Sequence, residues 1–395
     1  MKKCLYIHDH IFKKKDNYFY SEGKMSNDVL ERYDLVENQI INILCRSENI
    51  QNTKDMGSKL TKITKENAFF YPVKGINFSH IFSKFFFKNI KLIFRLIKKS
   101  DFIVVRLPSF LGIFCLIINI IFNKKYFIEF VGSPKEALLM AKSNHSILYK
   151  LFVSIFDKLN QYFVYHADGV IYVTQFSLQE KFPSKGFQAT ASNVEVNVDI
   201  IKPKIEDYKV NLENIKIGLI ASYNNEYKGL DIAIKAISIL KQKGHNVSLY
   251  ILGSGKLLNH YTNLSQKFGV KEHIHFEGSL AGGDAVLEWL KKLDLYIQPS
   301  RTEGLPRALI EAMSVGLPAI ASNVGGIPEL LPKEYLIEKE DFENLASKLE
   351  KLLISKELRF NSGLENWETS QKYDAKVLKK ERQKFWSKSK EIIFQ

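Results

Sequence analysis

Cysteine is scarce in this chain, with Cys4, Cys45 and Cys115 the only three among 395 residues. They form no Cys-x-x-Cys pair and none stands at metal-ligand spacing from a histidine, which excludes a disulfide framework and a zinc finger. All three lie in apolar segments. We therefore expect buried, reduced thiols and a cytoplasmic location.

Long hydrophobic runs are also missing. The longest, residues 111–122, is interrupted by Asn119 and is too short for a bilayer, which needs about 20 residues. The short apolar run near the start stops at His8, so no signal peptide is expected. These features predict a protein that is soluble or peripheral at the inner face of the cytoplasmic membrane.

Two motifs of other nucleotide-binding enzymes are absent. The sequence has no Asp-x-Asp, so no metal is expected to hold a diphosphate. No Gly-x-Gly-x-x-Gly follows the first predicted strand, which disfavours a dinucleotide-dependent dehydrogenase. The apolar content of 45% and charged content of 25% are close to globular averages, which excludes disordered and fibrous classes.

Acidic residues are outnumbered, with 43 Asp and Glu against 57 Lys and Arg, a net charge of +14. Most of the excess lies in residues 1–200, with 28 basic and 18 acidic side chains. No nucleic-acid motif accompanies it, so nucleic acid is not an expected partner. Residues 74–99 carry seven Lys and Arg, no acid, and interleaved apolar residues. This stretch either contacts an anionic membrane surface or packs on the core with a solvated basic face.

Apolar runs that alternate with amphipathic stretches predict an α/β fold with mostly parallel strands. In the first half we expect strands at residues 4–8, 102–106, 126–130 and 169–173, and helices at 27–45, 109–122 and 134–166. In the second half a strand–helix unit repeats at least five times between residues 215 and 353. The chain length suggests two or three domains. We place them at 1–200 and 201–372, followed by a basic helix at 373–395.

The segment 298–318 is the most informative part of the sequence. A strand ends at Gln298, and a loop with Gly304 leads into a helix whose first N–H groups suit phosphate oxygens. Glu303 lies just before this helix and Glu311 about two turns into it, a rise of about 12 Å at 1.5 Å per residue. That spacing fits a diphosphate between two hydroxyl-rich ends. Alternatively, Glu303 caps the helix and Glu311 is a surface charge.

The pair Glu303 and Glu311 resembles the Glu-x7-Glu signature of retaining glycosyltransferases of family 4. Further segments resemble motifs of the same family, in the same order: a Lys-Gly motif at 228–231, a Val-Gly-x-Gly turn at 251–255, a Phe-x-Gly at 275–278 and a Gly-Gly-x-x-Glu at 319–329. The resemblance implies the GT-B fold, in which two Rossmann-like domains face across a cleft. Segments 106–109 and 130–134 are similar to bacterial surface-polysaccharide glycosyltransferases.

The resemblance implies roles for the matching residues. Lys228 would bind the donor diphosphate, Glu303 would contact the transferred sugar, and Glu311 would hold the ribose hydroxyls. The rest of the donor site would be formed around the nucleobase by Gly253, Gly255, Phe276 and Gly278, and at the phosphates by Gly304, Leu305, Arg307 and Leu309.

The chain departs from the family pattern at two places. The usual Arg before the Lys-Gly motif is replaced by Ser222 and Tyr223, so Arg307 or a first-domain residue substitutes for it, or one phosphate cation is missing. Many relatives carry a His where Val131 and Gly132 stand. Gly132 either lets the backbone approach the donor sugar, as a catalytic-site residue, or is a simple turn glycine.

The acceptor site is expected near the first strand, with contacts from a loop that contains Tyr20, Ser21 and Gly23. His8 and His10 are further candidates, although an ordinary polar loop residue is the better explanation of each.

The resemblance implies metal-independent sugar transfer with retention from a UDP- or GDP-linked donor, without a cofactor. The second domain would bind the donor and the first a glycan acceptor on a lipid carrier, for a bacterial surface or capsular polysaccharide. The C-terminal helix would return to the first domain. Two alternatives remain open: a sugar-nucleotide epimerase or phosphorylase with the same fold, and a non-enzymatic membrane-associated scaffold.

Overall fold

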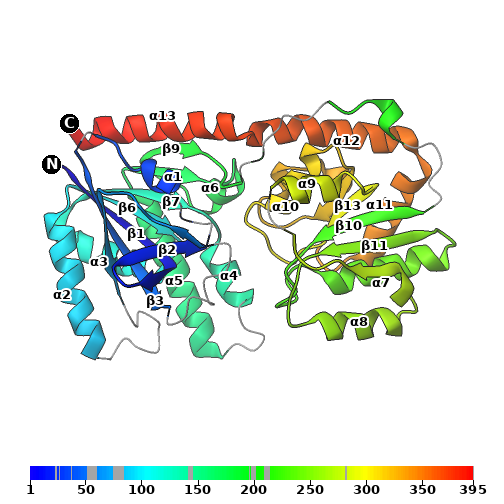
Figure 1. The fold of residues 1–395 in the computed structure, drawn as a ribbon, viewed down its shortest axis with the longest axis horizontal. Helices are drawn as coiled ribbons and strands as arrows, with labels where there is room; N and C mark the ends of the chain where they lie inside the picture. The colour runs from blue at the N-terminus through cyan, green and yellow to red at the C-terminus, as the bar shows by residue number, and fades with distance from the viewer. Residues whose placement is uncertain are drawn as a thin grey trace. The chain divides into compact units, whose positions relative to one another are not determined.

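The computed structural model describes residues 1–22, 25, 27–36, 38–50, 60–73, 84–140, 146–194, 196, 202–208, 214–280 and 283–394. The chain forms two compact α/β units (Figure 1). Unit 1 consists of Met1–Ala191 together with Lys379–Gln395, and unit 2 of Ser192–Leu378. The C-terminal segment therefore belongs to the same unit as the N-terminus.

Unit 1 is built on a nine-stranded sheet whose parallel part has the order β5-β3-β1-β6-β7-β8-β9. The long strand β1 continues with β3 past the end of β6 and pairs antiparallel with β2, which pairs with β4. The bounds are β1 Lys3–Lys15, β2 Tyr18–Glu22, β3 Ile40–Asn49, β4 Leu60–Lys62, β5 Ala68–Pro72, β6 Phe102–Leu107, β7 Lys125–Phe130, β8 Gly169–Tyr172 and β9 Phe187–Thr190.

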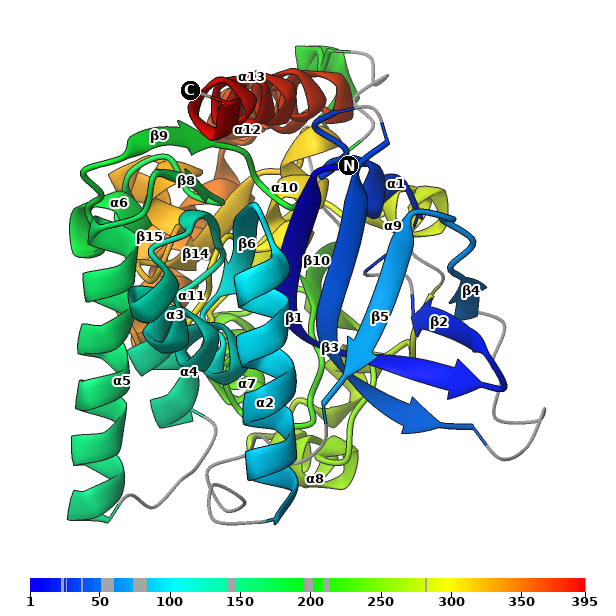
Figure 2. The same ribbon diagram turned by 90° about the vertical axis from the view of Figure 1, so that its left-hand side faces the viewer.

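Helices cover both faces of the unit 1 sheet. Helices α2 (Lys84–Lys99), α3 (Phe110–Phe122) and α5 (Ile147–Tyr165) share one hydrophobic core with alternate residues of β1, β6, β7 and β8 (Figure 2). The other face receives α13 (Ala375–Phe394), where Phe385 and Trp386 pack edge-on against Phe127 at centroid distances of 6.5 Å. The last helix is therefore part of the core of unit 1.

The helix predicted for residues 27–45 is wrong. Only Asn27–Glu31 forms a helix, α1, and Ile40–Asn49 forms β3. This strand lies inside the sheet between β1 and β5, and its residues from Ile41 to Cys45 are buried. A strand that is buried on both faces is a continuous apolar run, which periodicity does not separate from a buried helix.

Unit 2 contains a six-stranded parallel sheet with the order β12-β11-β10-β13-β14-β15. Its strands are β10 Ile215–Ile220, β11 Val247–Leu252, β12 Ile274–Phe276, β13 Leu295–Gln298, β14 Ala319–Ser322 and β15 Leu336–Ile337. The helices are α7 Leu230–Gln242, α8 Leu258–Lys267, α9 Asp284–Leu290, α10 Arg307–Ser314, α11 Phe342–Ile354 and α12 Lys356–Ser370. The strand order reverses between β10 and β13, and such a reversal is where doubly wound sheets bind ligands.

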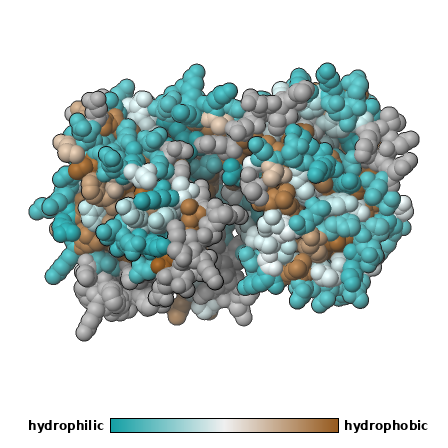
Figure 3. All heavy atoms as spheres, in the orientation of Figure 1, coloured by the Kyte–Doolittle hydropathy of each residue, from teal (hydrophilic) through white to brown (hydrophobic). Residues whose placement is uncertain are grey.

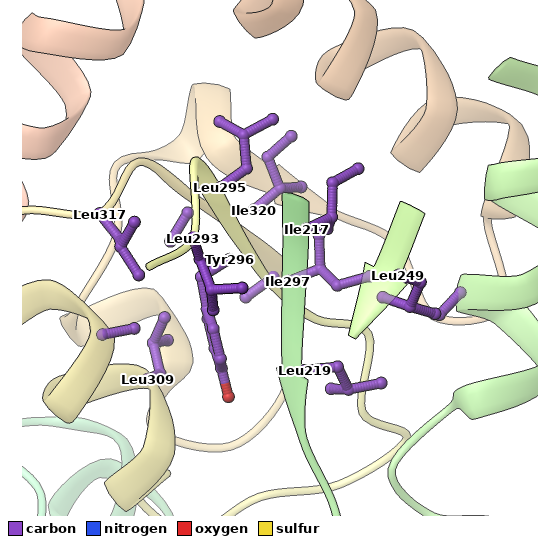
Figure 4. Packing of buried hydrophobic residues seen from close by; sticks show 14 of the residues in the cluster. Ile217, Leu219, Leu249, Leu293, Leu295, Tyr296, Ile297, Leu309, Leu317 and Ile320 are labelled. Atoms are coloured by element: carbon purple, nitrogen blue, oxygen red, sulfur yellow. The ribbon is translucent and has the colours of Figure 1, made fainter. Parts of the chain in front are cut away.

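The core of unit 2 fixes the ends of these two central strands. Leu219 from β10 and Tyr296 from β13 are fully buried, and Leu309 of α10 packs into the same cluster (Figure 4). Burial of each such side chain contributes about 1.5–3 kcal/mol. The loops that leave β10 and β13 therefore start from rigid positions.

Within the described ranges, no helix is both long and apolar enough to cross a membrane. All three cysteines are buried and unbonded, as expected. Burial raises the pKa of each thiol, so these residues are poor nucleophiles.

Candidate functional site

The loops that follow β10 and β13 meet at the reversal of strand order in unit 2. Gly229, at the end of the first loop, has φ 67° and caps α7. A Cβ atom there would lie 2.0 Å from the carbonyl oxygen of Pro299 in the second loop. Only glycine therefore permits this close contact, which brings Lys228 beside the loop that carries Glu303.

The carboxylate of Glu303 is held by three donors. Its Oε1 accepts hydrogen bonds from Lys228 Nζ and Ser300 Oγ, both at 2.7 Å, and from Gln298 Nε2 at 3.0 Å. Tyr296 in turn donates its hydroxyl to Gln298 Oε1 at 2.8 Å. In the described part of the chain, Oε2 of Glu303 has no such partner. One carboxylate oxygen is thus fixed and the other is available to a ligand.

Lys228 and Glu303 form an ion pair that is largely shielded from solvent. Their side chains are 13% and 9% exposed. Burial of Tyr296 below them raises the pKa of its hydroxyl well above its usual value, and the negative charges of Glu303 and Glu311 add to this. The tyrosine therefore stays protonated and remains a donor to Gln298.

Arg301 joins the same two loops. Its guanidinium donates two hydrogen bonds to Asp231 in the first turn of α7, at 2.8 and 2.9 Å, and two to Glu340, at 2.6 and 2.7 Å. It also donates to the carbonyl oxygen of Glu226 at 2.6 Å, and its backbone N–H donates to Tyr227. Arg301 thereby fastens the loop of Lys228 to the loop of Glu303.

Helix α10 starts next to this ion pair. The side chain of its N-cap residue, Pro306, accepts no hydrogen bond from the first N–H groups of the helix. Glu311, in the second turn, is paired with the exposed Arg307 at 3.2 Å. Burial raises the pKa of Glu311, and the nearby Arg307 offsets part of that rise. Burial of a charged carboxylate costs free energy, and hydrogen bonds from ligand hydroxyls would reduce that cost.

The expected rise of 12 Å between the two glutamates does not hold. Glu303 lies in the loop, four residues before α10 begins at Arg307. Only the second half of the Glu-x7-Glu spacing is helical, because Pro306 delays the helix start. Glu311 is one turn into the helix, not two.

A second group of loops surrounds Gly253. This residue has φ 149°, and a Cβ atom on it would lie 1.8 Å from the carbonyl oxygen of Ala221. Its N–H donates to Gly278 O at 2.6 Å, and a Cβ on Gly255 would overlap the backbone of Tyr223. The turns after β10, β11 and β12 are thus packed backbone to backbone.

The structure gives Tyr223 a role inside the protein. Its side chain is buried, its hydroxyl donates to Gly253 O at 2.8 Å, and its ring meets Phe276 edge-on at 5.7 Å. This position, where the family carries an arginine, therefore supports the turn after β11. Arg307 instead forms an ion pair with Glu311 on the same helix, α10.

The candidate acceptor residues Tyr20 and Ser21 were expected in a loop, but both lie within strand β2. Ser21 on β2 is buried and bonded to His10 Nε2 at 2.9 Å, and it accepts the N–H of Met25 at 3.1 Å. Tyr20, its neighbour on β2, is half-buried. Gly132 follows β7, and a Cβ there would meet nothing within 4 Å. Gly23 lies outside the described residues.

Three functional positions were missed from the sequence. Gln298 and Ser300 hold Glu303, and Arg301 fastens the two loops. Their signal was available: Gln298 is the last residue of a predicted strand, and Ser300 and Arg301 follow it just before Gly304. The sequence alone did not show which polar group each would contact.

The comparisons with known proteins show the family to which the chain belongs. Residues 202–363 match the family model described as glycosyl transferases group 1. Protein CapJ of Staphylococcus aureus is 34% identical over 400 residues, which cover 99% of this chain and 96% of CapJ. The chain belongs to the glycosyl transferases group 1. The expected membership in family 4 is confirmed.

Other proteins are similar to part of the sequence of this group 1 glycosyltransferase or share its fold. The amylovoran biosynthesis glycosyltransferase AmsK of Erwinia amylovora is 34% identical over 136 residues, 32% of this chain and 33% of AmsK. Sucrose-phosphate synthase of Thermosynechococcus elongatus superposes with a TM-score of 0.69 at 14% identity, over 98% of this chain and 99% of its own. The predicted GT-B fold with two Rossmann-like domains is confirmed.

Group 1 glycosyltransferases transfer sugars from nucleotide sugars with retention and without a metal ion. Among the residues that the structure describes, no group of three or more His, Cys, Asp and Glu side chains could hold a metal.

Proposed function

We propose that this glycosyltransferase moves a sugar from a nucleotide-sugar donor to a glycan acceptor on a lipid carrier, in the synthesis of a bacterial surface polysaccharide. Unit 2 (Ser192–Leu378) binds the donor and unit 1 the acceptor. The observation that carries the donor site is the buried pair of Lys228 and Glu303, at the reversal of strand order and beside the start of α10. The kinship with CapJ and AmsK supports the polysaccharide assignment.

Different residues of the donor site bind the diphosphate, the transferred sugar and the ribose. Lys228 donates hydrogen bonds to the diphosphate as well as to Glu303. The backbone N–H groups of Gly304, Leu305 and Leu309, at the start of α10, also donate to the diphosphate. Glu303 Oε2 accepts a hydrogen bond from the transferred sugar. Glu311 accepts hydrogen bonds from the ribose hydroxyls, which offset the cost of its burial.

In the reaction, the bond from the anomeric carbon to the β-phosphate oxygen breaks while the acceptor hydroxyl attacks from the same face. The departing phosphate oxygen receives the hydroxyl proton, so no separate base is needed. Lys228 and the dipole of α10 stabilise the negative charge that develops on the diphosphate. In unit 1, Gly132 leaves open space at the end of β7, and Tyr20 on β2 contacts the acceptor.

The donor nucleotide is a UDP or GDP sugar. UDP is the better first test, because the Anabaena protein HepE, which shares the fold at a TM-score of 0.63 and 14% identity, was solved with UDP. Sugar nucleotides are cytoplasmic metabolites, so we propose a cytoplasmic enzyme. The basic residues of 74–99 would hold it at the anionic inner face of the membrane; residues 74–83 lie outside the described residues.

Thermal stabilisation by nucleotides tests the donor site directly. A ligand at 100 times its Kd adds about 2.7 kcal/mol to the folded state, so UDP or GDP should raise the melting temperature of the wild type. Lys228→Ala and Glu311→Ala should lose most of this shift. Lys243→Ala is the matched control, because Lys243 also pairs with a glutamate and lies at the opposite end of α7. Equal shifts in all four proteins would contradict the assignment.

Product analysis separates sugar transfer from the alternatives. Incubation of a nucleotide sugar with a membrane lipid extract should give a glycosylated lipid product and free nucleotide diphosphate. An isomerised nucleotide sugar formed without acceptor would indicate an epimerase, and a sugar phosphate a phosphorylase. No turnover with intact nucleotide binding would favour a scaffold.

A further inference from the structure

Helix α3 exposes an apolar stripe. Its sequence from Phe110 to Phe122 contains no charged residue. One side is buried against the sheet, but Ile117, Ile120 and Ile121 are exposed, the last to 71%. Surface helices ordinarily carry polar residues on their outer side. The outer side of α3 is therefore built for contact with something apolar.

Helix α5 repeats this arrangement. Ile147, Leu148, Leu151 and Ile155 are all exposed, with Ile147 at 85%. Their spacing of three and four residues puts them on one side of the helix. Tyr162 and Tyr165 extend the exposed stripe toward the other end. We call the exposed residues of α3 (117, 120 and 121) and of α5 (147, 148, 151 and 155) the apolar face.

The three helices α2, α3 and α5 lie side by side on the same face of the sheet (Figure 2). Phe94 of α2 contacts Phe122 of α3 at a centroid distance of 4.5 Å. Phe110 of α3 contacts Phe156 of α5 at 4.3 Å. In Figure 3, brown hydrophobic atoms are visible among teal hydrophilic ones on the surface of both units.

Cations border the apolar face. Helix α2 exposes Lys91, Arg95, Lys98 and Lys99, and α5 exposes Lys150 and Lys158. The three helices together contain a single acidic residue, Asp157, which is only partly exposed. A surface that combines apolar side chains, tyrosines and cations matches an anionic bilayer, whose headgroups attract the cations and whose interface accepts the apolar groups.

We propose that the outer sides of α2, α3 and α5 form a docking surface for an anionic lipid bilayer. The apolar face enters the interfacial region, and the cations of α2 and α5 lie at the level of the headgroups. This goes beyond an electrostatic contact through residues 74–99, because the apolar face supplies a component of binding that salt does not screen. It complements the proposed lipid-linked acceptor, but its test needs neither donor nor acceptor.

Co-sedimentation with vesicles tests the proposal. The full-length protein is mixed with phosphatidylcholine vesicles, with or without 30 mol% phosphatidylglycerol, at low salt and at 0.5 M salt. The apolar variant carries Ile120→Gln, Ile121→Gln and Leu148→Gln. The cation variant carries Lys91→Gln, Arg95→Gln and Lys98→Gln. The control is Ile354→Gln, because Ile354 is a similarly exposed isoleucine, at 75%, on unit 2.

The wild type should pellet with the anionic vesicles at both salt concentrations, and the control should match it. The apolar variant should bind at least tenfold more weakly at both. The cation variant should lose binding mainly at low salt, since screening already weakens charge attraction at high salt.

Equal pelleting of the wild type and the apolar variant would overturn the proposal. So would a dimer, measured by light scattering, that the apolar variant converts to a monomer without any vesicle binding, because the face would then belong to a second copy of the chain. Nucleotide stabilisation should be the same in all these variants. A failure here is thus distinguishable from a failure of the donor-site assignment.

Discussion

Arg301 offers the sharpest test of the site geometry, because removal of one side chain should loosen two loops at once. The guanidinium is bound by Asp231, by Glu340 and by the carbonyl oxygen of Glu226. Arg301→Ala removes all five hydrogen bonds and leaves Asp231, which is mostly buried, without its cation. In the described structure, no other side chain of the Lys228 loop or the Glu303 loop is hydrogen-bonded to both Asp231 and Glu340.

The magnitude follows from the kind of contact that is lost. Loss of one partner of a buried ion pair costs about 3–5 kcal/mol, and Arg301 is only partly buried, so we expect about 3 kcal/mol. For a unit of this size, that lowers the melting temperature by about 6–12 °C. Arg301→Lys keeps a charge but not the paired geometry and should lose about half as much.

The pH dependence of this loss is also fixed in sign. Burial tends to raise the pKa of Asp231, but the hydrogen bonds and charge of Arg301 outweigh it, so the pKa lies below its ordinary value. A lowered pKa of a carboxyl group means stability that is present above about pH 3.9 and lost as the pH falls through the folded-state value. The difference between wild type and Arg301→Ala should therefore be large at pH 7 and shrink below about pH 4.

Differential scanning calorimetry of the full-length protein measures the change in melting temperature. The relevant unfolding transition is the one that moves to higher temperature when nucleotide is added. Donor KM measured beside kcat adds a readout of position, since a loosened Lys228 loop should raise KM more than it lowers kcat. Lys243→Ala, which removes an exposed ion pair, should change stability by less than about 1 kcal/mol. If Arg301→Ala melted with the wild type, the reasoning from these contacts would be refuted.

Three further predictions concern the donor site. Glu311→Gln should leave the melting temperature at pH 7 unchanged or higher while it weakens nucleotide binding at least tenfold, because burial raises the pKa of Glu311 and its ionised form therefore costs stability above that pKa; a parallel loss of stability and binding would contradict this. Gly253→Ala should destabilise unit 2 by about 3 kcal/mol or more, since its Cβ would overlap Ala221 O, whereas Gly244→Ala, with open space around it, should cost about 1 kcal/mol for its positive φ alone; chemical denaturation compares them. Sugar transfer should persist in excess EDTA, and loss that Mn²⁺ or Mg²⁺ restores would contradict a metal-free donor site.

Unit 2 could be predicted from the sequence because each strand there is short and is followed by a polar or glycine-containing turn and an amphipathic helix. The end of strand β13 was predicted at the observed residue, Gln298, and the helix after the Gly304 loop is α10. Unit 1 lacks this regularity. Strand β3 reads as part of a helix, and the short strands β2, β4 and β5 were not predicted, because long-range pairing rather than local pattern fixes them.

The sequence indicated which residues form the donor site but not how they contact one another. Lys228 and Glu303 are 75 residues apart in the sequence and were assigned to different parts of a ligand. Their ion pair depends on the strand order, which brings their loops together. Tyr223 was seen only as a replacement for an arginine. Its packing against Gly253 and Phe276 depends on three separate turns and became visible only in the fold.

The place of α13 in unit 1 bears on how the protein is made. Phe385 and Trp386 cover Phe127 and Tyr33, so the sheet that begins with the first residues lacks part of its core until the last ones have been synthesised. Unit 2 is complete earlier, at Leu378. Domains usually fold in order from the N-terminus during synthesis, but here the N-terminal unit should be the last to finish. A nascent chain that stalls before residue 379 would carry a folded unit 2 and an open apolar surface on unit 1, a target for chaperones.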